Sequence, residues 1–171
     1  MTTLADPVQG CRIHALGSMR YVACCTPAFH QRYFAQGVSA RTLASAPVLV
    51  FNRKDALQAR YAHRIIGRAA WEPPVWWLPS SRAFVQATLG GLGWTMNPLP
   101  LVQAELDAGQ LVPLRARAWE DVPLYWQHWR VNSQAMEALT DAVLAAARAL
   151  GAAALGAGHG RRHRCGHLAW R

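Results

Sequence analysis

The sequence contains a single lysine, Lys54, and only nine acidic residues, so its formal charge of +9 comes almost entirely from arginine. Arginine enrichment of this kind is expected of a GC-rich coding sequence. Four of the arginines (positions 161, 162, 164 and 171) lie in the last eleven residues, and without them the net charge falls from +9 to +5. This distribution favours a solvated surface over a nucleic-acid-binding face.

Cysteine is also scarce, with Cys11, Cys24, Cys25 and Cys165 as the four examples. Cys24 and Cys25 are adjacent within an apolar run, and neighbouring residues of a strand point to opposite faces. The spacing therefore excludes both a disulfide framework and a shared metal site for this pair. We interpret these cysteines as reduced, small and buried side chains.

No apolar run reaches the length of a membrane-spanning helix. The opening residues, MTTLADPVQG, have neither a basic nor a long apolar segment, which argues against a signal peptide and predicts a cytoplasmic protein. Half of the 171 residues are hydrophobic and about a sixth are charged. This composition is typical of a globular chain with one domain or two small lobes.

Strand-like and helix-like segments alternate along the chain, which predicts an α/β fold with parallel strands joined by right-handed crossovers. Apolar, β-rich segments predict buried strands, and apolar residues recurring every three to four positions predict helices. The expected strands cover 19–26, 48–51, 75–78, 93–97, 111–114 and 123–129. The expected helices follow Pro27 and Ser39 and cover 55–67, 81–92, 98–109 and 133–150.

Residues 151–171 lose this periodicity and consist mainly of Gly, Ala, Arg and His, which predicts a disordered tail. His159, His163, Cys165 and His167 lie close together there, but their spacing matches no compact zinc motif. A frayed tail or a shifted reading frame accounts for the composition better than a metal centre.

The chain contains no arrangement typical of a catalytic site and no recognisable cofactor motif. It has no G-x-S-x-G elbow and no phosphate-binding loop, and the glycines of GGLGW follow a helix instead of opening one. His14, His30, His63 and His128 each stand alone in the sequence, as surface or packing histidines do. We therefore expect a non-enzyme without a cofactor or metal.

Short polar side chains follow three successive strands: Asn52 after VLVF, Ser80 and Ser81 after VWWL, and Asn97 at the end of GWTMN. Ligands of open α/β sheets bind beyond the carboxyl ends of the strands. The two serines also precede a helix, where one can cap the backbone N–H groups or both can help to hold a carboxylate. Their recurrence favours a binding site, with helix capping as the alternative for at least one serine.

Several stretches resemble the effector-binding domain of LysR-type transcriptional regulators, specifically the lysine- and arginine-sensing ArgP or LysG type. The matching stretches are PVQGC, LGSMRYVACCTPAF, APVLVFNRKDALQ, LPSSRAFVQATLGGLGWTMNP and VPLYWQHWR, which cover most of residues 7–150. The resemblance implies a fold like type 2 periplasmic binding proteins, with the second lobe complete and the first partial. Residues 1–25 would be first-lobe remnant and crossover strand, 26–118 the second lobe, 119–150 the return strand and helix, and 151–171 the tail.

The resemblance also implies an effector site. Ser80 and Ser81 match its helix-start positions, and Asn52, Met96 and Asn97 match strand ends that face the cleft. Trp76, Trp77 and Trp94 are candidate cleft walls, with packing in the core as the alternative. Lysine or arginine is the suspected effector, and the candidates for its acidic partner are Asp55 and Glu72.

Members of the family begin with a helix-turn-helix and a dimerising linker helix, which this sequence lacks. The resemblance therefore implies an N-terminally truncated regulator that contacts DNA only through the missing helix-turn-helix and forms homo-oligomers at full length. Two alternatives remain: a non-functional truncated remnant with exposed apolar faces, and a stand-alone solute-binding protein of the same fold.

Overall fold

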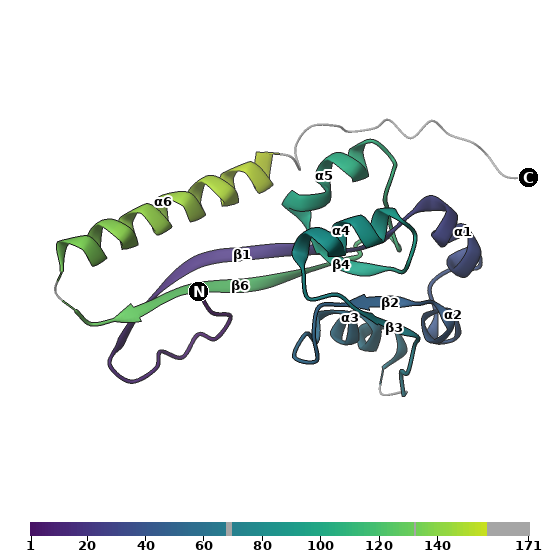
Figure 1. Ribbon diagram of the computed structural model, residues 1–171, viewed down its shortest axis with the longest axis horizontal. Helices are drawn as coiled ribbons and strands as arrows, with labels where there is room; N and C mark the ends of the chain where they lie inside the picture. The colour runs from purple at the N-terminus through teal and green to yellow at the C-terminus, as the bar shows by residue number, and fades with distance from the viewer. Residues whose placement is uncertain (68–69, 132, 157–171) are drawn as a thin grey trace, which may run out of the picture. The chain divides into compact units, whose positions relative to one another are not determined.

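The computed structural model describes residues 1–67, 70–131 and 133–156, which form two compact units (Figure 1). Unit 1 contains Met1–Ser18 and the residues from Pro123 onward, and unit 2 contains Met19–Val122. Within the described ranges, no helix is both long and apolar enough to cross a membrane. The elements are β1 (Cys11–Cys25), α1 (Pro27–Phe34), α2 (Ala40–Ser45), β2 (Val48–Val50), α3 (Leu57–Ile66), β3 (Val75–Trp77), α4 (Ser81–Leu89), β4 (Thr95–Pro98), α5 (Leu99–Asp107), β5 (Val112–Pro113), β6 (Trp119–Trp129) and α6 (Gln134–Gly156).

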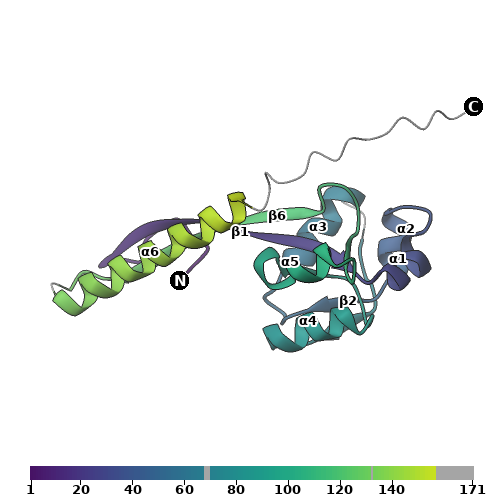
Figure 2. The same cartoon turned by 90° about the horizontal axis from the view of Figure 1, so that it is seen from above.

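The core of unit 2 is built around β2, whose three residues are all buried. Val48 and Val50 pack in one cluster with Tyr61 of α3, while Leu49 packs against Phe84 of α4. Figure 2 shows α3 and α4 on opposite sides of β2. The continuous apolar run VLVF is therefore explained by a strand that is covered on both faces.

The predicted all-parallel sheet is wrong for β1. This strand pairs antiparallel with β4, where Ala23 lies opposite Met96, and antiparallel with β5. The pairing of β2 with β3 is parallel, and a further parallel bridge joins Val48 to Trp94. The alternation of helices and strands along the chain does not determine which strand pairs with β1 or in which direction.

Local signals placed the helix starts correctly. Pro27 occupies the first turn of α1, and Ser39 caps α2 in a reciprocal capping box with Thr42. Helix α4 ends at Leu89, and the chain then returns through Gly93. A Cβ atom on Gly93 would lie 2.9 Å from the Pro47 carbonyl oxygen. Glycine is therefore required there for the close approach to Pro47.

Two predictions about element ends and burial are corrected. The strand VWWL was expected to be buried, but Val75, Trp76 and Trp77 of β3 are all exposed. Its described partner is β2, so β3 lies at a sheet edge. Helix α6 also extends beyond residue 150 to Gly156, because the alanine-rich sequence that continues it has high helix propensity. The predicted disorder and the histidine cluster of residues 157–171 lie outside the described residues.

The interpretation of Cys24 and Cys25 is confirmed. Both are buried and free, and they belong to different apolar clusters on opposite faces of β1. Burial raises the pKa of the Cys24 thiol to about 11 and that of Cys25 to about 12. Both thiols therefore stay protonated near neutral pH, which makes them poor nucleophiles.

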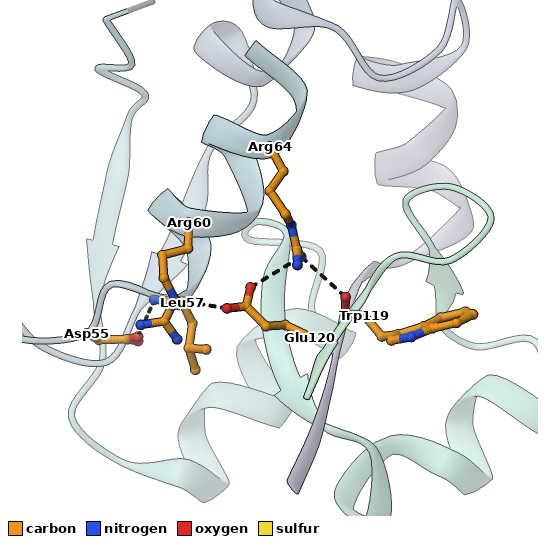
Figure 3. A network of polar contacts seen from close by, with 6 residues as sticks. All are labelled: Asp55, Leu57, Arg60, Arg64, Trp119 and Glu120. Carbon is orange, nitrogen blue, oxygen red and sulfur yellow. Dashed lines mark hydrogen bonds and ion pairs between the residues drawn. The ribbon is translucent and has the colours of Figure 1, made fainter. Parts of the chain in front are cut away.

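The two acidic residues at the start of β6, Glu120 and Asp121, form ion pairs with arginines of unit 2. Glu120 Oε1 accepts a 2.8 Å hydrogen bond from Arg60 Nε, and its Oε2 lies 3.2 Å from Arg64 Nη2 (Figure 3). Asp121 accepts two hydrogen bonds from Arg20, at 2.7 and 2.8 Å. These contacts join residues 55 or more positions apart, and sequence spacing alone did not reveal them.

Replacing Asp121 with asparagine should lower stability at neutral pH but not in acid. The hydrogen bonds from Arg20 hold the pKa of Asp121 below its ordinary value, so the stabilisation is present above about pH 4 and is lost as the pH falls through the native-state pKa. Because both side chains are over 40 % exposed, we expect a loss of only about 0.2–1 kcal/mol. Urea unfolding of Asp121→Asn and wild type at pH 7 and pH 3 measures the difference in the free energy of unfolding. Asp141→Asn, in an exposed part of α6, is the control, and a loss that is equal at both pH values would refute the linkage.

Unit 1 is formed by the first part of β1, the later part of β6 and helix α6 (Figure 1). Trp126 of β6 donates a 3.2 Å hydrogen bond from Nε1 to Thr140 Oγ1 of α6. Backbone hydrogen bonds between Thr2 and Tyr125 attach the N-terminal segment to β6. The later part of β6 is therefore held by both neighbouring segments of unit 1.

Candidate functional site

Unit 2 contains a cavity of about 410 Å³, a volume within the range of small-molecule sites. It lies where the ends of β2 and β4 meet the start of α4. Its lining combines apolar side chains with a few polar and charged groups. The lining residues are Tyr21, Phe51, Asn52, Lys54, Asp55, Leu57, Ser81, Phe84, Met96, Asn97, Pro98 and Leu101.

The loop after β2 is held in shape by its own side chains. Asn52 Oδ1 accepts a 2.8 Å hydrogen bond from the Lys54 backbone N–H. The Asp55 carboxylate accepts from the N–H of Phe51 and the N–H of Leu57, each at 3.1 Å. Short Asx-type turns of this kind fix a loop without regular secondary structure. The loop thereby presents Asn52, Lys54 and Asp55 to the cavity.

The start of α4 separates the two serines. Ser80 is the N-cap, and its hydroxyl accepts a hydrogen bond from the Ala83 N–H at 3.4 Å. Ser81 is the first helical residue and lines the cavity. The first N–H groups of a helix have no acceptor within the helix and carry its positive dipole end. This part of the lining is therefore suited to a negatively charged group.

Met96 and Asn97 of β4 form a buried part of the lining. The Asn97 amide nitrogen donates to Thr88 Oγ1 at 3.2 Å and lies 3.7 Å from Cys24 Sγ. Its Oδ1 atom is buried and has no partner among the described residues. A buried carbonyl oxygen without a donor costs free energy, so Asn97 carries an unsatisfied acceptor in this part of the structure.

Four predicted site residues thus line one cavity: Asn52, Ser81, Met96 and Asn97. Four others do not line it. Ser80 caps α4, Trp76 is exposed at the sheet edge, and Trp94 is fully buried against Tyr61 and Trp71. Trp77, like Trp76, is 53 % exposed and lies outside the lining.

Of the two acidic candidates, Asp55 lines the cavity and the exposed Glu72 does not. Sequence reasoning missed Lys54 and Tyr21. Lys54 contributes to the total charge, and its place two residues after the strand-end Asn52 is the signal that could have identified it. Tyr21 was assigned only to a buried strand.

The cavity can hold a molecule that carries charges of both signs. Lys54 and Asp55 supply opposite charges, while Leu57, Met96 and Leu101 supply apolar surface for an aliphatic chain. Burial, with a smaller contribution from Asp55, raises the pKa of Tyr21, so its phenol stays protonated and can donate a hydrogen bond. No charge transfer or bond cleavage is needed for any of these roles.

Comparison with protein families matches residues 2–148 to the LysR substrate binding domain. Among curated proteins, the HTH-type transcriptional regulator LysG of Mycobacterium tuberculosis is 39 % identical over 150 residues, covering 88 % of this chain and 49 % of the regulator. The HTH-type transcriptional regulator ArgP of Pseudomonas aeruginosa is 41 % identical over 143 residues, covering 84 % and 47 %. The chain spans about half the length of the curated relatives it matches.

Solved structures give the same result. The C-terminal domains of a LysR family protein from Agrobacterium tumefaciens align with a TM-score of 0.82 at 44 % identity, covering 86 % of this chain and 71 % of that one. Full-length LysG from Corynebacterium glutamicum with bound effector Arg aligns with a TM-score of 0.76 at 37 % identity, covering 85 % and 49 %. These matches confirm the predicted fold class, an α/β effector domain like type 2 periplasmic binding proteins.

Proposed function

This chain belongs to the LysR substrate binding domain family, and on that basis we propose that the cavity of unit 2 binds a basic amino acid, arginine or lysine. The observation that carries the proposal is the lining, which brings Asn52, Ser81 and the charged pair Lys54 and Asp55 into one cavity. A free basic amino acid offers a carboxylate, an ammonium group, an aliphatic stem and a cationic end. The carboxylate, the aliphatic stem and the cationic end each find a complementary group in the lining.

We assign the carboxylate of the effector to the start of α4. The Ser81 hydroxyl and the N–H groups of the first turn form the anion-favouring part of the cavity. The aliphatic stem would pack on Met96 and Leu101, and the cationic end would meet Asp55. Corynebacterium glutamicum LysG was solved with bound effector Arg, which supports arginine as the ligand class.

The role of the whole protein follows from its relatives, which are transcriptional regulators. We propose that this chain is a cytoplasmic, non-catalytic sensory part, and that it reaches operator DNA and forms homo-oligomers only in a longer protein with a DNA-binding segment. Amino acid export genes are the proposed targets, as in a relative named as a lysine export regulator in Corynebacterium efficiens. Effector binding would shift the population of the regulator's conformations.

The adjacent serines provide a matched test. Millimolar arginine or lysine should raise the melting temperature of the purified chain, because ligand bound to the native state stabilises it by about 2.7 kcal/mol at a hundred times its Kd. Ser81→Ala should reduce that ligand-induced rise. Ser80→Ala should instead lower the free energy of unfolding by the ~1 kcal/mol of a lost N-cap, so the melting temperature without ligand falls. The ligand-induced rise in melting temperature should be unchanged in this variant.

Scanning calorimetry of the three proteins, each with and without ligand, makes this comparison. Glutamate serves as the control ligand, because it shares the backbone groups but has an acidic side chain. A wild-type melt that does not respond to arginine or lysine would contradict the proposed function.

A further inference from the structure

His14 and His128 do not stand alone, as their sequence positions had suggested, but face each other within unit 1. Their Nε2 atoms are 3.4 Å apart, whereas the ring centroids are 5.5 Å apart. The Nε2 edges therefore point toward each other. The ring planes differ by only 7°, so the two Nε2 atoms meet head to head, and both rings must tilt for their lone pairs to converge on one point.

We propose that His14 and His128 bind a first-row transition-metal ion, of which Zn²⁺ is the natural example. Imidazole nitrogens bind Zn²⁺ at about 2.0–2.1 Å, and tetrahedral geometry then places two nitrogens about 3.3–3.4 Å apart. The observed 3.4 Å matches that separation. The same distance is long for a direct hydrogen bond, which has its optimum near 2.9–3.0 Å. The separation therefore fits a shared metal ion as well as it fits a long hydrogen bond.

The surroundings of His128 supply an independent observation. Its Nδ1 atom lies 2.9 Å from the Trp129 carbonyl oxygen, which can only accept, so Nδ1 carries the proton. In the neutral ring, Nε2 is then left with a free lone pair that points to His14. Histidine ligands of metals characteristically donate their other N–H to a carbonyl or carboxylate in this way.

The site is accessible and leaves room for other ligands. Both histidines are half-buried, and the Trp126 ring packs beside His128 with centroids 6.0 Å apart. Among the described residues, no group of three or more histidine, cysteine or acidic side chains is placed to hold a metal ion. The ion would therefore keep water or an external ligand in its remaining positions, and it would cross-link β1 to β6 within unit 1.

The test is a calorimetric titration of the full chain with Zn²⁺, repeated with histidine variants. To keep the tail from competing, all proteins carry His159→Asn, His163→Asn, Cys165→Ser and His167→Asn. In this background, His14→Ala and His128→Ala should each lower the Zn²⁺ affinity at least about tenfold, because each removes half of a chelating pair. The double variant should be little worse than either single one. The controls His30→Ala and His63→Ala should leave the affinity unchanged.

Histidine-ring ¹H–¹⁵N spectra of the same background without other substitutions provide a readout that does not depend on the folding of the variants. Zn²⁺ should shift the Nε2 resonances of His14 and His128 together and at the same stoichiometry. The proposal is overturned if these resonances do not move, or if only one of the two substitutions weakens binding, since that outcome indicates a single surface histidine.

Discussion

Replacing Trp94 with alanine should lower the free energy of unfolding by about 3–5 kcal/mol, whereas the same change at Trp76 should alter it by less than about 0.5 kcal/mol. Both tryptophans lie within residues 76–94, and both are candidates for the cleft wall from the sequence. Trp94 is fully buried, with its ring centroid 5.7 Å from that of Tyr61 and 6.1 Å from that of Trp71. Trp76 is 53 % exposed, so its truncation leaves no cavity.

Chemical denaturation of the two variants and wild type measures this contrast. Trp94→Phe is the informative third variant, because the Trp94 Nε1 atom is buried without a partner among the described residues. Phenylalanine keeps most of the apolar contact and removes the unsatisfied donor, so it should cost clearly less than alanine. Equal losses for Trp94→Ala and Trp76→Ala would show that Trp94 is not the packed centre of this core.

Features that depend on neighbouring residues were predictable from the sequence. Pro27, Ser39 and Ser80 start helices because a cap or a fixed φ angle acts within one turn. Part of the cavity was predictable for a related reason. Asn52, Ser81 and Asn97 each lie at or just beyond a strand end, and the fold brings those ends together.

Features that depend on pairing between distant segments were not predictable. Trp76 and Trp94 look alike in sequence, and their burial differs because β3 lies at a sheet edge while Trp94 bridges to Val48. The direction of β4 relative to β1 is set by the path of the chain and leaves no periodic signal. The contact between His14 and His128 joins residues 114 positions apart. Only the folded chain shows these relations.

Replacing Asp55 with asparagine should weaken arginine binding by about 10- to 100-fold, the loss expected when a hydrogen bond to a charged group is removed. Asp55 is the acidic residue of the cavity lining, and its carboxylate is held by the N–H groups of Phe51 and Leu57. An ionised carboxylate has about four lone-pair sites, so two remain for a ligand. The variant therefore tests whether this charge recognises the cationic end of the effector.

Asparagine at position 55 also disturbs the loop, because its amide group can accept fewer hydrogen bonds from the two N–H groups. Citrulline, which has nearly the shape of arginine but a neutral side-chain end, separates the two effects. If the Asp55 charge recognises arginine, wild type prefers arginine over citrulline and Asp55→Asn loses that preference. If Asp55 only supports the loop, the variant binds both ligands more weakly by the same factor.

Glu72→Gln, a change to an exposed acid outside the lining, should leave both affinities unchanged in calorimetric titrations. Retained preference for arginine in Asp55→Asn would show that another residue recognises the cationic end of the ligand.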